Sequence, residues 1–226
     1  MALYLMGGGS PELQRPVTTA VFEGAENALY LPFASSPKDI DGAQAWFKGT
    51  LRDAGVQTAL TTWKTFDGHS PEELEDFDLV YVGGGSPGRV AKELDKPGWR
   101  QALVRWVKSG RTYFGDSAGA LAACGPMDVA AGLDDDPLSV GARGLGLLQD
   151  LSIIPHSDVF PAGAAAAWAG EHGVEVLEIP EGAAVAIPEG VSRPSVQEGS
   201  LRALGTGGVA LVRPDGSREP VPLLDQ

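Results

Sequence analysis

The stretch that most constrains the fold of this chain is residues 111–123, which read Arg-Thr-Tyr-Phe-Gly-Asp-Ser-Ala-Gly-Ala-Leu-Ala-Ala. The pattern predicts a short apolar strand, a tight turn with Ser117 at its apex, and a helix of small residues. Gly115 and Gly119 flank Ser117 at the spacing of a nucleophile elbow, where glycines leave room for a sharp reversal. The same pattern also fits a glycine-rich turn in which Ser117 caps the helix. The motif alone leaves both interpretations open.

Strand-like and helix-like segments alternate before the elbow. This rhythm predicts an α/β fold with a doubly wound, mostly parallel sheet flanked by helices. After the elbow, residues 124–144 are loop-like, and the tail from Leu201 predicts antiparallel hairpins around residues 205–208 and 214–216. We expect residues 1–226 to form one domain. The predicted strands are 2–6, 28–33, 56–63, 79–82, 151–155, 174–179 and 183–187, and the predicted helices are 18–23, 36–54, one starting at 70, 90–94, 99–109 and 162–170.

The amino-acid composition limits the classes of molecule that this protein is expected to bind. The 17 basic and 30 acidic residues give a net charge of −13, which repels phosphate backbones and anionic lipid, so we expect neither nucleic acid nor membrane as a partner. The one cysteine, Cys124, excludes an intramolecular disulfide and a multi-cysteine metal site, and a buried thiol is expected. We expect no metal and no cofactor. The apolar stretch at residues 1–6 is too short for a signal peptide, which predicts a cytoplasmic protein.

A serine nucleophile needs a base, and histidine is the usual one near neutral pH. The chain has three histidines. His69 and His172 lie in polar turns, whereas His156 ends the apolar run Ile153-Ile154-Pro155. In a parallel sheet His156 would stand at the carboxyl edge of a strand, the edge at which the elbow presents Ser117. His156 is therefore the predicted base.

The base needs an acceptor that fixes its tautomer. Glu181 follows the predicted strand 174–179 and so stands at a strand end as well. Asp158, Asp128 and the run Asp134–Asp136 are alternatives, because the sequence does not measure their distances from His156.

Acyl transfer also needs donors for the oxyanion. The elbow places the N–H of Ala118 near Ser117, and the run Gly83-Gly84-Gly85 after the strand 79–82 can bring a second backbone N–H close. A phosphate loop is the competing interpretation, but the run lacks the lysine of the G-x-x-x-x-G-K-[ST] pattern. An oxyanion or substrate loop fits better.

In an α/β-hydrolase the elbow is followed by an acid and then by a histidine late in the chain, whereas no histidine follows His172 here, and the order that this chain offers is serine, histidine and then a later acid. Four segments in this order resemble the S51 serine peptidases, a family that includes aspartyl dipeptidases and cyanophycinases on a fold similar to class I glutamine amidotransferases. The resemblance implies a Ser117–His156–Glu181 triad and an oxyanion hole from the N–H groups of Gly85 and Ala118. The segments are 82–85 (Val-Gly-Gly-Gly), 115–120 (Gly-Asp-Ser-Ala-Gly-Ala), 154–156 (Ile-Pro-His) and 179–182 (Ile-Pro-Glu-Gly).

The substrate segments depart from the dipeptidases of that family. Ser86-Pro87-Gly88 follows the glycine run, and Asp116 adds a carboxylate that would oppose an acidic substrate unless Arg89 or Arg143 compensates it. The expected function is a serine peptidase acting on small peptides, which include dipeptides with N-terminal Asp. The alternative function is a ligand-binding or regulatory module without that activity. The sequence is also compatible with a homodimer. The candidate substrate-binding residues are Gly84, Ser86, Arg89, Asp116 and Asp158.

Overall fold

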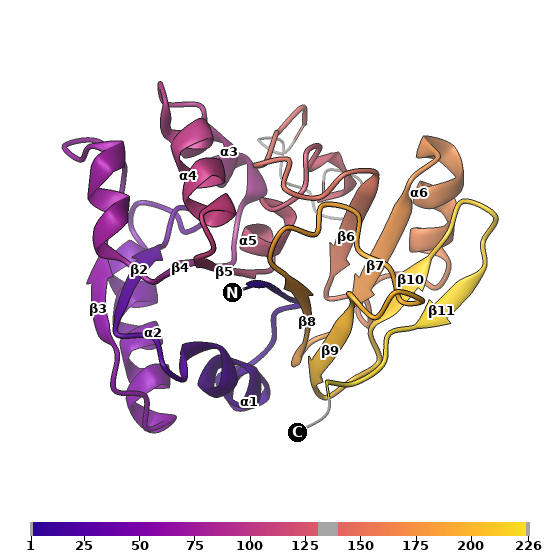
Figure 1. Ribbon diagram of the computed structural model, residues 1–226, viewed down its shortest axis with the longest axis horizontal. Coiled ribbons are helices and arrows are strands. Elements are labelled where there is room, and N and C mark those ends of the chain that lie inside the picture. The colour runs from indigo at the N-terminus through magenta and orange to yellow at the C-terminus, as the bar shows by residue number, and fades with distance from the viewer. Residues whose placement is uncertain (1, 131–139, 225–226) are drawn as a thin grey trace.

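The computed structural model describes residues 2–130 and 140–224. A large sheet holds β1 (Ala2–Met6), β2 (Asn27–Leu31), β3 (Ala59–Thr62), β4 (Leu79–Val82), β5 (Thr112–Asp116), β8 (Ala183–Pro188) and β9 (Arg202–Gly205). Their order is β3-β2-β4-β5-β1-β8-β9 (Figure 1). The first five strands run parallel, whereas β8 is antiparallel to both of its neighbours. The mostly parallel central sheet predicted from the sequence is confirmed.

Helices cover both faces of the large sheet. They are α1 (Pro11–Phe22), α2 (Ile40–Asp53), α3 (Pro87–Leu94), α4 (Trp99–Lys108) and the single turn α5 (Ala118–Leu121). The first two pack on one face and the other three on the opposite face (Figure 1). Strand β4 shows the reason, since Leu79 and Tyr81 join the apolar layer of α1 and α2, while Val80 and Val82 join the other layer. A strand buried on both faces reads as a continuous apolar run, as this one does.

The part after the elbow differs from the prediction in one respect. A second sheet with the order β11-β10-β7-β6 stands beside the first (Figure 1). The turn at residues 214–216 is the predicted hairpin between β10 and β11. The turn at residues 205–208 is not a hairpin, because β9 pairs with β8 in the large sheet and β10 pairs with β7 in the small one. The small sheet holds β6 (Leu151–Pro155), β7 (Glu175–Ile179), β10 (Ala210–Val212) and β11 (Arg218–Pro220), and α6 (Ala164–His172) connects β6 to β7.

The helices predicted over 36–54 and 90–94 begin instead at Ile40 and Pro87, and two further helix predictions need larger corrections. Helix α1 begins at Pro11, seven residues earlier than predicted. Proline usually ends or interrupts a helix, but Pro16 lies inside this one. The helix expected from Ser70 is the 3₁₀ helix η1 (Pro71–Asp76), although the capping box of Ser70 and Glu73 that predicted it is present. Over residues 2–130 and 140–224, no helix is both long and apolar enough to cross a membrane.

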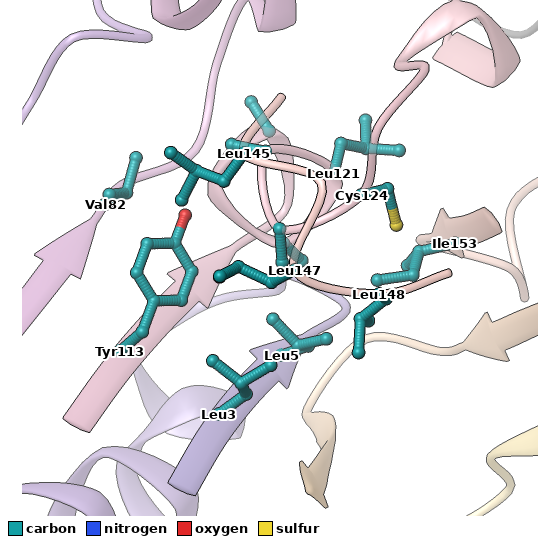
Figure 2. Packing of buried hydrophobic residues seen from close by; sticks show 14 of the residues in the cluster. Leu3, Leu5, Val82, Tyr113, Leu121, Cys124, Leu145, Leu147, Leu148 and Ile153 are labelled. Atoms are coloured by element: carbon teal, nitrogen blue, oxygen red, sulfur yellow. The ribbon is translucent and has the colours of Figure 1, made fainter. Parts of the chain in front are cut away.

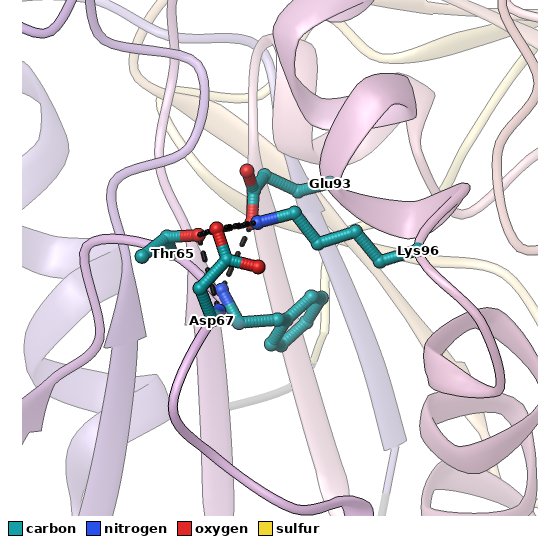
Figure 3. Close-up of polar contacts among 5 residues, drawn as sticks. Thr65, Asp67, Glu93 and Lys96 are labelled. Carbon is teal, nitrogen blue, oxygen red and sulfur yellow. Dashed lines mark hydrogen bonds and ion pairs between the residues drawn. The ribbon is translucent and has the colours of Figure 1, made fainter.

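A polar cluster fixes the helix that follows the glycine run 83–85. Glu93 on α3 accepts hydrogen bonds from the Thr65 hydroxyl (3.0 Å) and the Phe66 N–H (2.9 Å). Lys96 forms ion pairs with Glu93 (2.9 Å) and Asp67 (2.8 Å), as Figure 3 shows. The loop after β3 is thereby tied to α3.

Apolar packing holds the turn after the elbow in place (Figure 2). The Tyr113 hydroxyl, which points into this layer, donates to the carbonyl of Gly119 at 2.7 Å. Residues 145–148 close the layer, and the N–H of Leu147 donates to Ala123 O at 2.9 Å. Cys124 is fully buried here, and burial raises the pKa of its thiol to about 12.

This burial makes Cys124 unreactive in the native protein, because the thiolate is the reactive species. We expect a thiol reagent such as dithiobis-nitrobenzoate at pH 8 to leave the folded protein unmodified and to titrate one thiol in 6 M guanidinium chloride. Rapid stoichiometric modification of the folded protein would contradict the burial.

Candidate active site

The elbow has the geometry that its glycines predict. Ser117 lies at φ 52° and ψ −108°, an unfavourable backbone conformation for a residue with a side chain. A Cβ on Gly115 would overlap the carbonyl of Gly119, and a Cβ on Gly119 would overlap the carbonyl of Val82. The Ser117 hydroxyl makes no capping hydrogen bond to α5. The capping interpretation of the motif is therefore wrong.

Ser117, His156 and Glu181 form one chain of hydrogen bonds. Ser117 Oγ lies 2.9 Å from His156 Nε2, and His156 Nδ1 lies 2.8 Å from Glu181 Oε1. The imidazole and the carboxylate are about one-third exposed. The imidazole can thus accept the hydroxyl proton of Ser117 while the carboxylate holds its other nitrogen.

His156 reaches Ser117 from the second sheet, not from the parallel sheet that we expected to carry it. Strands β6 and β7 pair in parallel, with Pro155 opposite Ile179, so His156 and Glu181 follow neighbouring strand ends. His156 also has a positive φ of 52°, which turns the chain sharply after Pro155. The shared strand edge predicted from the sequence is replaced by the junction between two sheets.

Four consecutive carbonyl groups at the end of β1 tie these segments together. The carbonyl of Met6 accepts the N–H of Ser117 (3.0 Å), and that of Gly7 accepts the N–H of His156 (2.9 Å). The next two carbonyls, of residues 8 and 9, accept the N–H of Gly182 and the side-chain amide of Gln14, both at 2.9 Å. One short backbone segment therefore sets the positions of all three elements of the hydrogen-bonded chain.

Glycine is required in this segment because the imidazole lies directly on it. A Cβ on Gly8 would overlap the His156 ring, and a Cβ on Gly7 would overlap the carbonyls of Ile179 and Pro180. None of the sequence patterns considered above assigns a role to the glycine run at residues 7–9. The signal that could have found it is a run of three glycines at the carboxyl end of a central parallel strand, where ligands and active sites gather.

The second glycine run lies against the elbow from the other side. A Cβ on Gly84 would stand 3.2 Å from the Cβ of Ser117. In the described part of the chain, the N–H groups of Gly85 and Ala118 donate to no backbone carbonyl. Both are therefore free to bind an oxygen of a ligand.

Asp116 is 5% exposed and faces the layer of α1, like Phe114 two residues earlier. Its Oδ2 accepts a hydrogen bond from Gln14 at 3.3 Å, while its Oδ1 has no hydrogen-bond partner among the described residues. Burial raises the pKa of this carboxyl to about 6, although the His156 imidazole, Gln14, the Gly8 N–H and the Tyr81 hydroxyl favour its ionised form. The burial argues against the contact with substrate that we expected for Asp116.

The other predicted acids bind backbone groups. Asp158 Oδ1 accepts the N–H of Glu181 at 3.0 Å, so it supports the acid without touching the imidazole. Asp128 Oδ1 accepts the N–H of Gly141 at 3.1 Å. The third alternative, Asp134–Asp136, lies outside the described residues.

The predicted substrate residues after the glycine run begin α3. Ser86 caps this helix by accepting the N–H of Arg89 at 3.2 Å, and its own N–H donates to Ala34 O. The Arg89 side chain is half-buried in the first turn. Both residues therefore follow directly on the loop that lies against the elbow.

The fold and the elbow define a class, the doubly wound α/β proteins with a serine at a strand-to-helix reversal. A model of peptidase family S51 matches residues 3–193, and the chain belongs to that family. This confirms the family expected from the sequence and places the chain among the peptidases.

Two curated relatives are similar in sequence. Peptidase E of Citrobacter koseri is 31% identical over 182 residues, which are 77% of this chain and 75% of that protein. Peptidase E of Streptomyces coelicolor is 32% identical over 114 residues, which are 50% of this chain and 44% of that protein. The chain thus aligns with less than half of the length of the Streptomyces relative.

Two crystal structures share the fold. One is a peptidase from an acI-B1 Actinobacterium, with a TM-score of 0.73 at 20% identity, covering 99% of this chain and 95% of that one. The other is a putative peptidase E from Listeria monocytogenes, with a TM-score of 0.69 at 18% identity, covering 91% and 98%.

The raised pKa of Asp116 predicts a pH-dependent effect of Asp116→Asn on stability. The folded protein keeps the Asp116 proton up to about pH 6, whereas the unfolded chain releases it near 3.8. The stability contributed by the protonated carboxyl is therefore present below pH 4 and lost as the pH rises through 6. Relative to the wild type, Asp116→Asn should gain about 2–3 kcal/mol of unfolding free energy between pH 4 and 7.

Urea unfolding of both proteins at pH 4, 5, 6, 7 and 8 measures this difference. An effect of the substitution on packing changes the difference in unfolding free energy by the same amount at all five pH values, so it does not alter the dependence of that difference on pH. A difference that stays constant with pH would mean that Asp116 is not perturbed.

Proposed function

We propose that this chain is a serine peptidase of small peptides in which Ser117 is the nucleophile, His156 the general base and Glu181 the acid that orients it. The observation that carries the proposal is the continuous chain of hydrogen bonds from Ser117 Oγ through the imidazole to Glu181 Oε1, at 2.9 and 2.8 Å. A serine hydroxyl without such a base is a weak nucleophile.

The proposed reaction follows from this arrangement. As Ser117 Oγ attacks the scissile carbonyl, its proton moves to His156 Nε2, and the charge on the carbonyl oxygen is stabilised by the N–H groups of Gly85 and Ala118. The imidazolium then donates that proton to the leaving amine, and the peptide C–N bond breaks. Water repeats the sequence on the acyl-enzyme with the imidazole as base, which releases the acid and restores Ser117.

Glu181 acts through the imidazole. Its carboxylate accepts a hydrogen bond from the Nδ1–H group of His156 and so leaves Nε2 free to accept the proton of Ser117. The Asp158 carboxylate holds the backbone of Glu181, and the Thr206 hydroxyl donates to the Glu181 carbonyl at 3.2 Å. We infer that this support keeps the carboxylate in line with the ring.

The chain belongs to a peptidase family, and both curated relatives are named peptidase E. The resemblance of its sequence motifs to a family that includes aspartyl dipeptidases favours short peptides as substrates. We propose dipeptides with N-terminal Asp as the first substrates to test, with Arg89 as the cation that receives the acidic side chain. Asp116 opposes this pairing less than the sequence suggests, because it faces the layer of α1 and not the solvent.

Ser117→Ala should lower kcat/KM for the best peptide by more than about 1,000-fold, because the nucleophile is lost. It should also abolish covalent labelling by a fluorophosphonate probe. Ser109→Ala is the matched control, since its hydroxyl only bonds Trp106 O at the end of α4, and it should retain both activities. The panel contains Asp-X, Glu-X and neutral dipeptides, isoaspartyl peptides and simple esters.

Labelling of the wild type at Ser117 with turnover of peptides supports the proposal. Undiminished turnover by Ser117→Ala would overturn it. Absence of both labelling and turnover in the wild type would favour a binding module that keeps the elbow without the reaction.

The two acids near His156 can be separated by substitution. Glu181→Gln should lower kcat at least about 100-fold, because an amide favours the wrong tautomer of the imidazole. Asp158→Asn should lower it less than about 10-fold, because the new amide oxygen still accepts the Glu181 N–H. Equal losses, measured on the same peptide at pH 7.5, would show that Glu181 is not the orienting acid.

A further inference from the structure

Two buried polar side chains have no part in the proposed reaction, although they lie directly behind it. Gln14 on α1 is 4% exposed and Asp116 at the end of β5 is 5% exposed. Polar groups so deeply buried are retained in a core only when their hydrogen bonds are satisfied. The partners of these two therefore indicate what they do.

The Gln14 amide bridges the glycine segment and the elbow. Its Nε2 donates one bond to the carbonyl of Gly9 at 2.9 Å and another to Asp116 Oδ2 at 3.3 Å. Both protons of the amide nitrogen are thus used. The bond to Gly9 holds the last residue of the segment whose preceding carbonyls accept the N–H groups of Ser117, His156 and Gly182.

The segment needs such a fixing point. Gly8 and Gly9 have φ values of 90° and 120°, a region that leaves glycine backbones free to rearrange. Since Gly8 lies against the imidazole ring and its carbonyl binds Gly182, a shift of this segment would move both the base and the acid.

We propose that Gln14 and Asp116 are positioning residues of the peptidase: the carboxylate orients the Gln14 amide, and the amide holds residues 7–9 against His156 and Glu181. This inference rests on the proposed function of Ser117, His156 and Glu181. Neither residue touches the reacting atoms, so their effect on the reaction is through the geometry of the base and the acid.

Substitution of Gln14 should act on the chemical step and leave peptide binding unchanged. Gln14→Met keeps the volume and removes both hydrogen bonds. We expect kcat to fall on the order of 10-fold to 100-fold with KM within about 2-fold of the wild type, because a displacement of about 1 Å has effects of this size. Asp116→Leu should give a loss similar to that of Gln14→Met.

The double variant and the conservative variant test whether the two residues act as one unit. Gln14→Met with Asp116→Leu should be no slower than the slower single variant, because the bridge is already broken. Asp116→Asn keeps an acceptor for Gln14 and loses the charge, so it should retain kcat within about 3-fold. Multiplicative losses, or a loss in Asp116→Asn as large as in Asp116→Leu, would overturn the positioning role.

Thr50→Val is the control for a general loss of stability. Thr50 is also buried, and its hydroxyl bonds Trp46 O on α2, away from the glycine segment. Thr50→Val should leave kcat unchanged when each protein is assayed the same number of degrees below its own melting temperature. If Gln14→Met does not fold, Gln14→Leu is the second variant, since it also removes both hydrogen bonds and introduces no charge.

A readout without turnover separates this inference from the proposed function. The Nδ1 proton between His156 and Glu181 gives a low-field NMR signal when the ring is held in place, and it can be recorded in the Ser117→Ala background. We expect Gln14→Met to broaden or remove this signal and Thr50→Val to retain it. A signal unchanged by Gln14→Met, or a wild-type kcat in that variant, would overturn the inference. Loss of the signal in a protein that hydrolyses no peptide would support the positioning role and refute only the proposed function.

Discussion

The geometry of the site depends on the backbone of residues 6–9. Their four carbonyls each receive one N–H, from the elbow, from the histidine, from the residue after Glu181 and from Gln14. Backbone hydrogen bonds of this kind impose a fixed spacing that side-chain packing alone does not. The segment serves this purpose because it has no side chains at residues 7–9, and because β1 lies between β5 and β8 in the large sheet.

This arrangement solves a problem that the fold creates. The elbow belongs to the large sheet, whereas His156 and Glu181 follow strands of the small sheet. Two sheets meet through side chains, and their relative position is set by how those side chains pack. One apolar cluster runs through both, with Leu5, Ile153 and Leu177 all fully or almost fully buried. The packing brings the sheets together, and the hydrogen bonds of residues 6–9 fix the positions of Ser117, His156 and Glu181 relative to one another.

The sequence predicts the parts of this site that depend on local geometry. The glycines around Ser117 predict the elbow because the reversal overlaps any Cβ at those positions. His156 is recognisable because it ends an apolar run. Gln14 could not be found, since Pro16 hides the helical character of its segment and its partners are 5 and 102 residues away. The second sheet was missed for a similar reason: the turn at residues 205–208 looks like a hairpin, and which sheet a strand joins is decided by tertiary packing.

The same features make the site a region of stored free energy. Ser117 and His156 both have positive φ values, which cost on the order of 1–3 kcal/mol each in residues with side chains. Burial of the Asp116 carboxyl adds a further unfavourable contribution above pH 6. The surrounding core must offset these terms, and it lies on both faces of the sheet that carries the elbow. Substitutions that relax this strain should therefore stabilise the fold and weaken the reaction, because the strained backbone is what aligns the serine, the imidazole and the carboxylate.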